Sequence, residues 1–406
     1  IDRRNFHLFQ PLLYQVATGG LSPANIAAPL RSVLRRQKNT TVLLGEVLEI
    51  DAAKKEVVLE DRRIGFDSLI VAAGARHSYF GKPQWEPFAP GLKTIEDATE
   101  IRRRVLLAFE SAERETDPEK IREWLTFVII GGGPTGVELA GTLGEIALHT
   151  LRNDFRHINP ASAQILLLEG AERILGPFAP ELSQKAVEAL ARLNVTVRTR
   201  ALVTDIQADA VTARVGEKTV VIRARTILWA AGVQASPLGK ALAKATGVEL
   251  DKAGRVVVEA DLSIKGHPDI FVIGDLAHFK TESGKTLPGV APVAMQQGRY
   301  VADLITARSS GKTMPAFSYT DRGSMATIGR AAAVAEIGSW RFSGVLAWLA
   351  WLFVHLMYLV QFQNRVLVLM QWAWNYFTRN RSARLITEHG AQPAVAASAE
   401  QKQASP

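Results

Sequence analysis

The chain has 406 residues, which is too long for one ordinary hydrophobic core and indicates two or three domains. Hydrophobic residues make up 47% and charged residues 22%, proportions typical of a globular protein. The absence of cysteine excludes disulfides, iron–sulfur clusters, thiolate-ligated metals and a catalytic dithiol. The net charge of +8 would suit anionic lipid or nucleic acid, but no run of interleaved basic and aromatic residues favours nucleic acid.

Short β-rich runs with Gly- and Pro-punctuated loops fill residues 1–124 and 224–330, whereas 125–223 alternate between strand and helix patterns. Residues 70–74 and 227–232 are both apolar strands that end on a glycine, Gly74 and Gly232 respectively. A dinucleotide-binding domain inserted between two halves of a discontinuous domain would explain this likeness. No secretory signal is visible, and the chain opens on Ile1 without an initiator Met, as if inside a strand.

The sharpest local pattern is an apolar strand at 125–130 that runs into a G-x-G-x-x-G turn and then a helix. Gly131 permits the tight turn, Gly133 lets the backbone approach a pyrophosphate, and Gly136 allows close packing of helix against strand. The N-terminus of the helix offers unpaired N–H groups to the anion. An unrelated glycine-rich turn is the alternative, but the order strand, turn, helix indicates a dinucleotide site.

A second apolar strand at 164–168 ends on Glu169, which is placed to accept hydrogen bonds from ribose hydroxyls. Glu169 lies 33 residues after Gly136, farther than the usual spacing of about 20. We attribute the excess to residues 152–163, which read as a helix end and a loop. A carboxylate here would repel a 2′-phosphate and therefore favours NADH, although the nearby Arg173 leaves NADPH open.

Residues 338–387 are dense in Trp, Leu and Val and contain no Asp or Glu. Two apolar stretches, 344–360 and 366–377, are separated by QFQNR and followed by Arg379, Arg381 and Arg384. Paired short helices lying in one membrane leaflet fit this pattern, with tryptophans at the interface and the arginines on anionic headgroups. A dimer interface is the main alternative and a transmembrane hairpin the third. His355 is expected to be a packed or interfacial residue, and 390–406 a disordered tail.

Taken together, these segments resemble the type II NADH dehydrogenases, the monotopic NADH:quinone oxidoreductases among the two-dinucleotide-domain flavoproteins. The resemblance covers nearly the whole chain. Besides GGGPTGVELAG at 131–141 and the Trp-rich end, it rests on FQPLLY at 9–14, IFVIGD at 270–275, GVAPVAMQQG at 289–298 and GSMATIGR at 323–330.

The resemblance implies FAD and NADH as cofactors and no metal. It gives Gly274 and Asp275 to the ribityl chain of FAD, Asp2 to the FAD ribose, and Arg3 to the flank of the adenine. The family's first strand and first G-x-G-x-x-G, which hold the FAD pyrophosphate, are absent. A truncated reading frame is one explanation, and a flavin-free relative is the other.

The implied reaction passes a hydride from NADH to the flavin and then two electrons to a quinone. Glu138 matches a family carboxylate near the nicotinamide and flavin. The alternative is a surface carboxylate at the start of a helix, stabilised by the helix dipole and without a role in the reaction. Family members carry A-Q-x-A-x-Q near the quinone; here Pro292 replaces the first Gln, while Gln296 keeps the second position and Gln297 follows it. Gln296 is the preferred quinone ligand, and polar residues at a helix start are the alternative.

The predicted fold is therefore α/β, with two Rossmann-like dinucleotide-binding domains, one inserted in the other, and a C-terminal α-helical membrane anchor. The predicted parts are an FAD domain at 1–124 and 224–330, an NADH domain at 125–223, and a membrane-associated helical domain at 331–389. The expected partners are a quinone, a membrane surface at the cytoplasmic face of the inner membrane, and a second copy in a homodimer. A soluble reductase of a small electron-transfer protein and a non-catalytic NADH-binding membrane protein are the rival functions.

Overall fold

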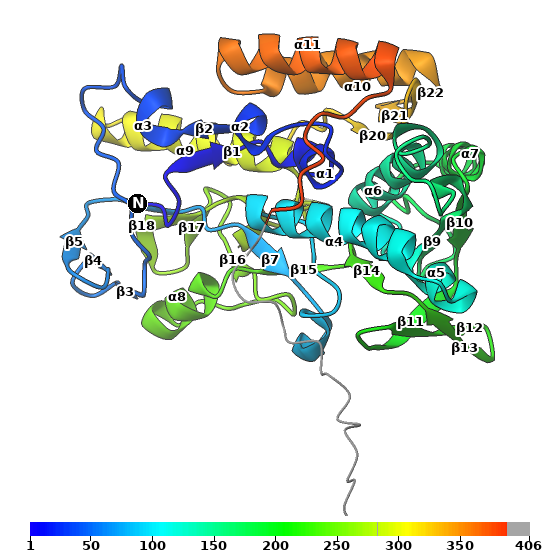
Figure 1. The fold of residues 1–406 in the computed structure, drawn as a ribbon. Helices are drawn as coiled ribbons and strands as arrows, with labels where there is room; N and C mark the ends of the chain where they lie inside the picture. The colour runs from blue at the N-terminus through cyan, green and yellow to red at the C-terminus, as the bar shows by residue number, and fades with distance from the viewer. Residues whose placement is uncertain (282, 388–406) are drawn as a thin grey trace, which may run out of the picture.

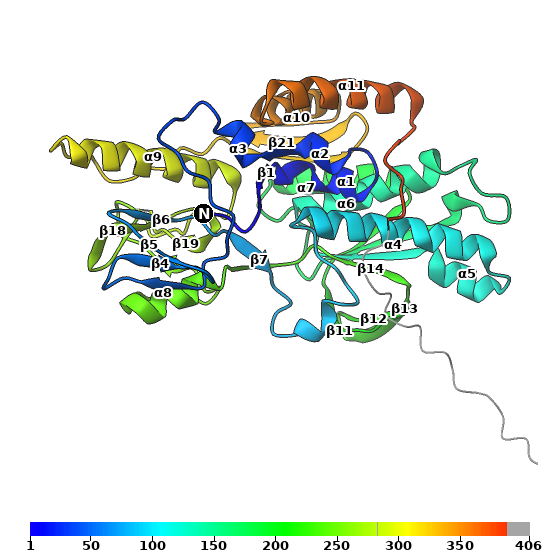
Figure 2. The same cartoon turned by 60° about the vertical axis from the view of Figure 1, so that its left-hand side comes forward.

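The computed structural model describes residues 1–281 and 283–387, so the tail predicted at 390–406 lies outside the described residues. Two α/β units lie side by side beneath a layer formed by the last two helices (Figure 1). Seen after a 60° turn, these helices still lie on one outer face of the molecule (Figure 2).

The first unit is built on a four-stranded parallel sheet in the order β10-β9-β8-β14. All residues of β8 and β14 are buried, because helices cover one face of the sheet and further strands cover the other. The elements are β8 (Thr126–Ile130), β9 (Gln164–Leu168), β10 (Val195–Arg198) and β14 (Thr226–Trp229), with helices α4 (Ile95–Arg114), α5 (Pro118–Trp124), α6 (Pro134–Glu145) and α7 (Pro180–Arg192). The predicted strand–turn–helix of 125–141 is confirmed.

An antiparallel meander of β11 (Ala201–Ile206), β12 (Ala210–Val215) and β13 (Lys218–Arg223) packs its buried side chains against this sheet. The chain then returns to the sheet as β14, which pairs with β8. The domain boundary expected at residue 223 therefore falls one strand too early, because an apolar strand ending on glycine looks alike in either domain.

The second unit holds the sheets β17-β18-β6 and β3-β4-β5 and the pair β16-β19. Its core gathers residues such as Ile50, Val71, Leu242 and Ile270. The elements are β3 (Glu49–Asp51), β4 (Glu56–Val58), β5 (Arg63–Gly65), β6 (Leu69–Val71), β16 (Val256–Val257), β17 (Ser263–Ile264), β18 (His267–Val272), β19 (Ala277–His278), α8 (Leu238–Thr246) and α9 (Ala291–Ser309).

Two chain crossings connect the units, and they lie side by side. Strand β7 (Ala75–His77) follows Gly74, and β15 (Val233–Ala235) follows Gly232; the two strands pair antiparallel. Both glycines have positive φ, +64° and +73°, which lets each strand turn into the crossing. This is the arrangement that insertion of one unit into the other requires.

The N-terminal segment crosses beneath the outer helices. Strands β1 (Phe6–Leu8) and β2 (Ala27–Pro29) pair antiparallel, and three short helices accompany them: α1 (Leu13–Ala17), α2 (Pro23–Ile26) and α3 (Leu30–Val33). Helix α1 is almost entirely buried and packs against α4 and α6. It therefore brings Tyr14 to the junction between the nicotinamide-type unit and the outer layer.

The C-terminal part is not helical throughout, contrary to the prediction. It begins with an antiparallel sheet of β20 (Ser324–Gly329), β21 (Ala332–Ile337) and β22 (Trp340–Ser343), and β20 packs on α6. Helices α10 (Val345–Tyr358) and α11 (Phe362–Thr378) follow. The start expected at residue 331 falls inside this sheet, because β20 is too short and too mixed in composition to stand out by itself.

Candidate functional site

The nicotinamide-type turn has the tight geometry that its glycines predict. A Cβ on Gly136 would overlap the carbonyl oxygen of Gly131, and one on Gly131, whose φ is +110°, would lie 2.6 Å from the carbonyl carbon of Ala230. A Cβ on Gly133 would instead meet no atom within 4 Å. No side chain caps the N-terminus of α6. Open space beside uncapped N–H groups fits a dinucleotide pyrophosphate.

Glu169 lies against this turn. Its Oε2 accepts a hydrogen bond from the Gly132 N–H (2.6 Å), and its Oε1 accepts one from Ala171 (2.7 Å). Each carboxylate oxygen keeps a free lone pair for a ribose hydroxyl. Arg173 donates from Nη2 to the Gly176 carbonyl, but its buried Nη1 has no partner within the described residues.

Glu138 lies on α6, where the helix passes beneath β20. The side chain is half-buried, and burial raises its pKa to about 8, although a hydrogen bond from the Thr327 N–H acts in the opposite direction. Burial, followed by the charge of Glu138, raises the pKa of Tyr14 well above its usual value. Glu138 and Tyr14 are therefore close enough to interact electrostatically, and both carry their protons at neutral pH.

Asp275 and Gly274 form the corresponding turn of the second unit. Gly274 has a φ of +70°, and its N–H donates to Oε1 of the buried Gln297 (2.7 Å). The Asp275 carboxylate is partly exposed, and its Oδ2 lies 3.5 Å from Nζ of Lys93. Asp275 therefore has lone pairs free for sugar hydroxyls, and Lys93 adds a cation that sequence reasoning missed, since it carries no motif signal. These residues fit the ribityl end of FAD.

The Gln296 side chain, the preferred quinone ligand, forms hydrogen bonds with the backbone of Thr320. Its Nε2 donates to the Thr320 carbonyl (2.9 Å) and its Oε1 accepts from the Thr320 N–H (3.0 Å), which fixes α9 to the loop before β20. One N–H and one lone pair of the amide stay free. Asp2 accepts a hydrogen bond from the Arg4 N–H (2.8 Å) and pairs through its backbone with Leu44, while Arg3 is exposed.

The C-terminal arginines do not all face outward. Arg381 forms an ion pair with Glu145 of α6 (2.6 Å), with the two side chains 12% and 17% exposed, and Arg384 pairs with Asp154. The expectation that all three arginines meet lipid headgroups is therefore wrong for these two, because carboxylates remote in sequence fold against them. Arg379 stays exposed, with Nη1 3.2 Å from Nδ1 of His149.

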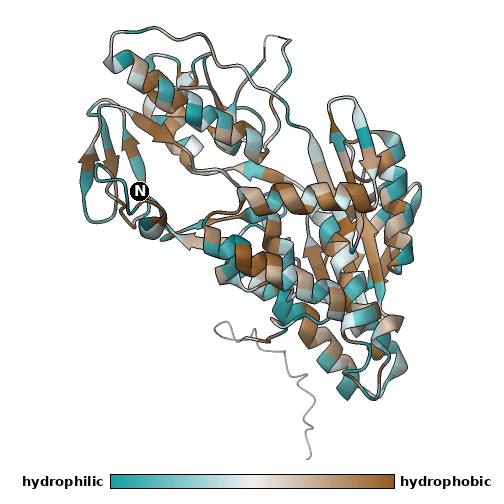
Figure 3. Cartoon of the chain, turned by 90° about the horizontal axis from the view of Figure 1, so that it is seen from above, coloured by the Kyte–Doolittle hydropathy of each residue, from teal (hydrophilic) through white to brown (hydrophobic). Residues whose placement is uncertain are grey.

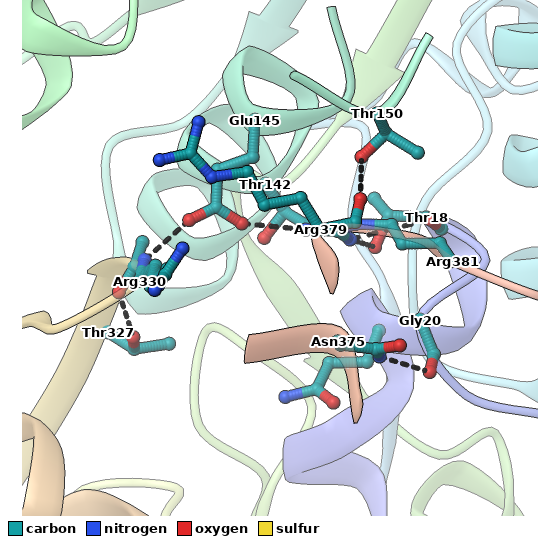
Figure 4. Close-up of polar contacts among 12 residues, drawn as sticks. Thr18, Gly20, Thr142, Glu145, Thr150, Thr327, Arg330, Asn375, Arg379 and Arg381 are labelled. Carbon is teal, nitrogen blue, oxygen red and sulfur yellow. Dashed lines mark hydrogen bonds and ion pairs between the residues drawn. The ribbon is translucent and has the colours of Figure 1, made fainter. Parts of the chain in front are cut away.

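A cavity of about 370 Å³ lies at this junction, between the C-terminal half of α6 and the helices α10 and α11. The Arg381–Glu145 pair contributes to its lining, as do Thr142 and Thr327 (Figure 4). Tyr14 lines it as well. His355 packs beside it: its ring stacks on Trp351 (4.3 Å between centroids) and its Nδ1 bonds to the Trp351 carbonyl.

The outer faces of α10 and α11 carry exposed apolar side chains. From Val345 to Thr378 the segment contains no carboxylate, and Phe353, Phe362 and Phe377 are 63%, 79% and 80% exposed. Figure 3 views the molecule from this side and shows hydrophobic residues along both helices. Neither these helices nor any other described helix combines the length and hydropathy of a membrane span.

Comparisons with known proteins identify the relatives of this chain. The sequence profile of the pyridine nucleotide-disulphide oxidoreductases matches residues 1–298, and that of the NDH2 C-terminal domain matches residues 322–380. The type II NADH:quinone oxidoreductases Ndh and NdhA of Mycobacterium tuberculosis are each 47% identical, covering 96% and 95% of this chain and 85% and 83% of their own lengths. The structure of NDH2 from Plasmodium falciparum in complex with NADH superposes with a TM-score of 0.86 at 20% identity, over 95% of this chain and 94% of that one.

Proposed function

Because the chain belongs to the type II NADH:quinone oxidoreductase family, we propose that it oxidises NADH and reduces a membrane quinone by two electrons, without pumping protons. The observation that carries this proposal is the course of α6. The helix begins at the open nicotinamide-type turn and passes Glu138, whose proton is held at neutral pH, beneath the C-terminal sheet. One rigid element thus connects the NADH end to the outer layer.

The nucleotide ends are held by the two turns described above. Gly133 and the uncapped start of α6 would take the NADH pyrophosphate, and Glu169 its ribose. Asp275 and Lys93 would hold the sugar end of FAD. When bound, FAD supplies the hydride acceptance and electron relay that no side chain of this cysteine-free chain could supply.

Glu138 and Tyr14 are the proton-bearing groups at the quinone end. The Tyr14 hydroxyl accepts a hydrogen bond from Gln15 (2.8 Å) and can donate its own proton to a carbonyl oxygen. Trp351, whose ring centroid lies 6.5 Å from that of Tyr14, has a buried indole N–H with no acceptor in the described part of the chain. A buried donor without a partner supports a carbonyl-bearing ligand here. Gln296, with one N–H free, remains a predicted quinone contact.

The apolar faces of α10 and α11 support attachment in the plane of a membrane, where quinone is dissolved. Large exposed patches of this kind usually mark an interaction surface. The proposal places the protein on the cytoplasmic face of the inner membrane. A homodimer through the same faces is the alternative occupant of this surface.

The direct test is NADH oxidation by the purified, FAD-loaded protein with a soluble quinone analogue. Turnover should require both substrates and be far lower with NADPH, because Glu169 repels a 2′-phosphate. A protein that binds FAD yet oxidises no NADH with any quinone analogue would contradict the proposal.

A further inference from the structure

None of the residues proposed to hold NADH or FAD lines the junction cavity, which shares Tyr14 and Trp351 with the proposed quinone end. Its lining is of two kinds. Trp348, Trp372 and Tyr376 form an aromatic wall on the inner faces of α10 and α11. The opposite wall, from the C-terminal ends of α6 and α7 and the β20–β21 turn, carries the polar and charged side chains of Thr142, Glu145 and Arg330 (Figure 4). An amphiphilic ligand would satisfy both walls.

The charges around this cavity do not balance. Among the described residues Glu145 is the only carboxylate of the lining, and it already pairs with Arg381 and accepts the Arg330 backbone N–H. Three further arginines line the cavity: Arg192, Arg330 and Arg379. Within the described residues none of the three forms an ion pair; the Arg330 guanidinium lies over the Tyr376 ring at 3.9 Å, and Arg379 contacts the His149 imidazole. All three side chains are exposed, so an anion could reach them and form ion pairs, whereas a neutral quinone could not.

The cavity lies beside the outer apolar face, and this position favours a phospholipid over a free phosphate. The Arg379 side chain follows the end of α11, two residues after Phe377, which is 80% exposed on the outer apolar face. The arginines of the cavity and the outer apolar face therefore meet at the C-terminal end of α11. A lipid whose phosphodiester lies at the arginines could pack its glycerol and the first acyl carbons against the aromatic wall and continue to the apolar face beside Phe377. A free phosphate would leave the aromatic wall without a partner.

We propose that this cavity binds the headgroup phosphate of an anionic phospholipid, held by Arg192, Arg330 and Arg379 against the aromatic wall. This inference rests on the membrane association given under the proposed function. It adds a specific lipid site to a surface that would otherwise bind any bilayer through its apolar side chains.

The test measures binding of monomeric dihexanoyl phosphatidylglycerol to the FAD-loaded protein by calorimetry. We expect affinity to fall at least 10-fold in Arg192→Gln/Arg330→Gln/Arg379→Gln. The control, Arg214→Gln/Lys218→Gln/Lys240→Gln, removes three exposed cations from β12, β13 and α8 that form no ion pair with any described residue, and it should bind like wild type. Unchanged KM for NADH would verify that both variants are folded.

Dihexanoyl phosphatidylcholine and inorganic phosphate should each bind at least 10-fold more weakly than the phosphatidylglycerol. Equal affinity in the arginine variant, or equal binding of either comparison ligand, would overturn the lipid site. Co-sedimentation with phosphatidylcholine vesicles separates this result from the membrane proposal. Sedimentation without specific phosphatidylglycerol binding would overturn only the lipid site, and specific binding without sedimentation would overturn only the membrane proposal.

Discussion

Glu138 combines a half-buried position on a rigid helix with a pKa that burial raises to about 8. Glu138→Gln should lower kcat by about 100-fold or more, the usual contribution of a proton-transferring side chain. In wild type the rate should fall as pH rises through 8, where the carboxyl loses its proton, and Glu138→Gln should lack this step. Glu110→Gln, at an exposed carboxylate of α4, should behave as wild type in the same pH–rate measurement.

The raised pKa of Glu138 also makes the stability of the folded state depend on pH. The folded carboxyl keeps its proton up to about pH 8, whereas the unfolded one loses it near its ordinary pKa of 4.5. The folded state therefore binds more protons between these values, and its stability falls as pH rises through this window. Between pH 5 and pH 8 the Tm of wild type should therefore fall relative to the Tm of Glu138→Gln. An unchanged difference would contradict the raised pKa.

Two glycines of the nicotinamide-type turn should separate binding from folding. The added methyl of Gly133→Ala meets no protein atom, so Tm should hold while KM for NADH rises at least 10-fold, because the methyl occupies the space left for the pyrophosphate. Gly136→Ala meets the Gly131 carbonyl, so it should also lose about 1–3 kcal/mol of stability. Unaltered NADH binding in Gly133→Ala would show that the nucleotide lies elsewhere.

At the scale of elements, the Arg381–Glu145 pair fixes the segment after α11 to α6. Removing one partner of a buried ion pair leaves an uncompensated charge, so Arg381→Met or Glu145→Leu should each cost about 3–5 kcal/mol, and the double variant should recover most of the loss. Urea unfolding of wild type, the two single variants and the double variant measures these free energies of unfolding. The exposed pair Arg200–Glu172 is the control and should contribute less than about 1 kcal/mol. Additive single losses would contradict the coupling.

Local patterns could be predicted from the sequence, and distant pairings could not. The strand, turn and helix of 125–141 are contiguous, and Glu169 ends the next strand, so periodicity and glycine spacing suffice to predict both. Lys93 and Asp275 are 182 residues apart, and Arg381 and Glu145 are 236 apart. Nothing local marks either pair, which is why Lys93 was missed and Arg381 was assigned to lipid. The strands β14 and β20 were misassigned because their neighbours in space decide to which unit they belong.

At the scale of the whole molecule, the outer faces of α10 and α11 should control attachment. Burial of a Phe side chain contributes about 1.5–3 kcal/mol, so Phe353→Ser/Phe362→Ser/Phe377→Ser should weaken vesicle co-sedimentation about 100-fold or more. The control Leu44→Ser/Leu202→Ser/Val221→Ser removes exposed apolar groups outside α10 and α11 and should sediment as wild type. Both variants should retain turnover with a soluble quinone analogue. Equal sedimentation of the two variants would contradict the role of these helices.

The proposed reaction requires that one chain connect an NADH site to a quinone site through a single bound FAD. The most direct measurement is the stoichiometry of NADH consumption by the FAD-loaded protein without oxygen. With no quinone present, about one NADH should be consumed per FAD; on addition of a soluble quinone analogue, oxidation should resume with one NADH consumed per quinone. Absence of the first step, or continued NADH consumption without quinone, would contradict the account.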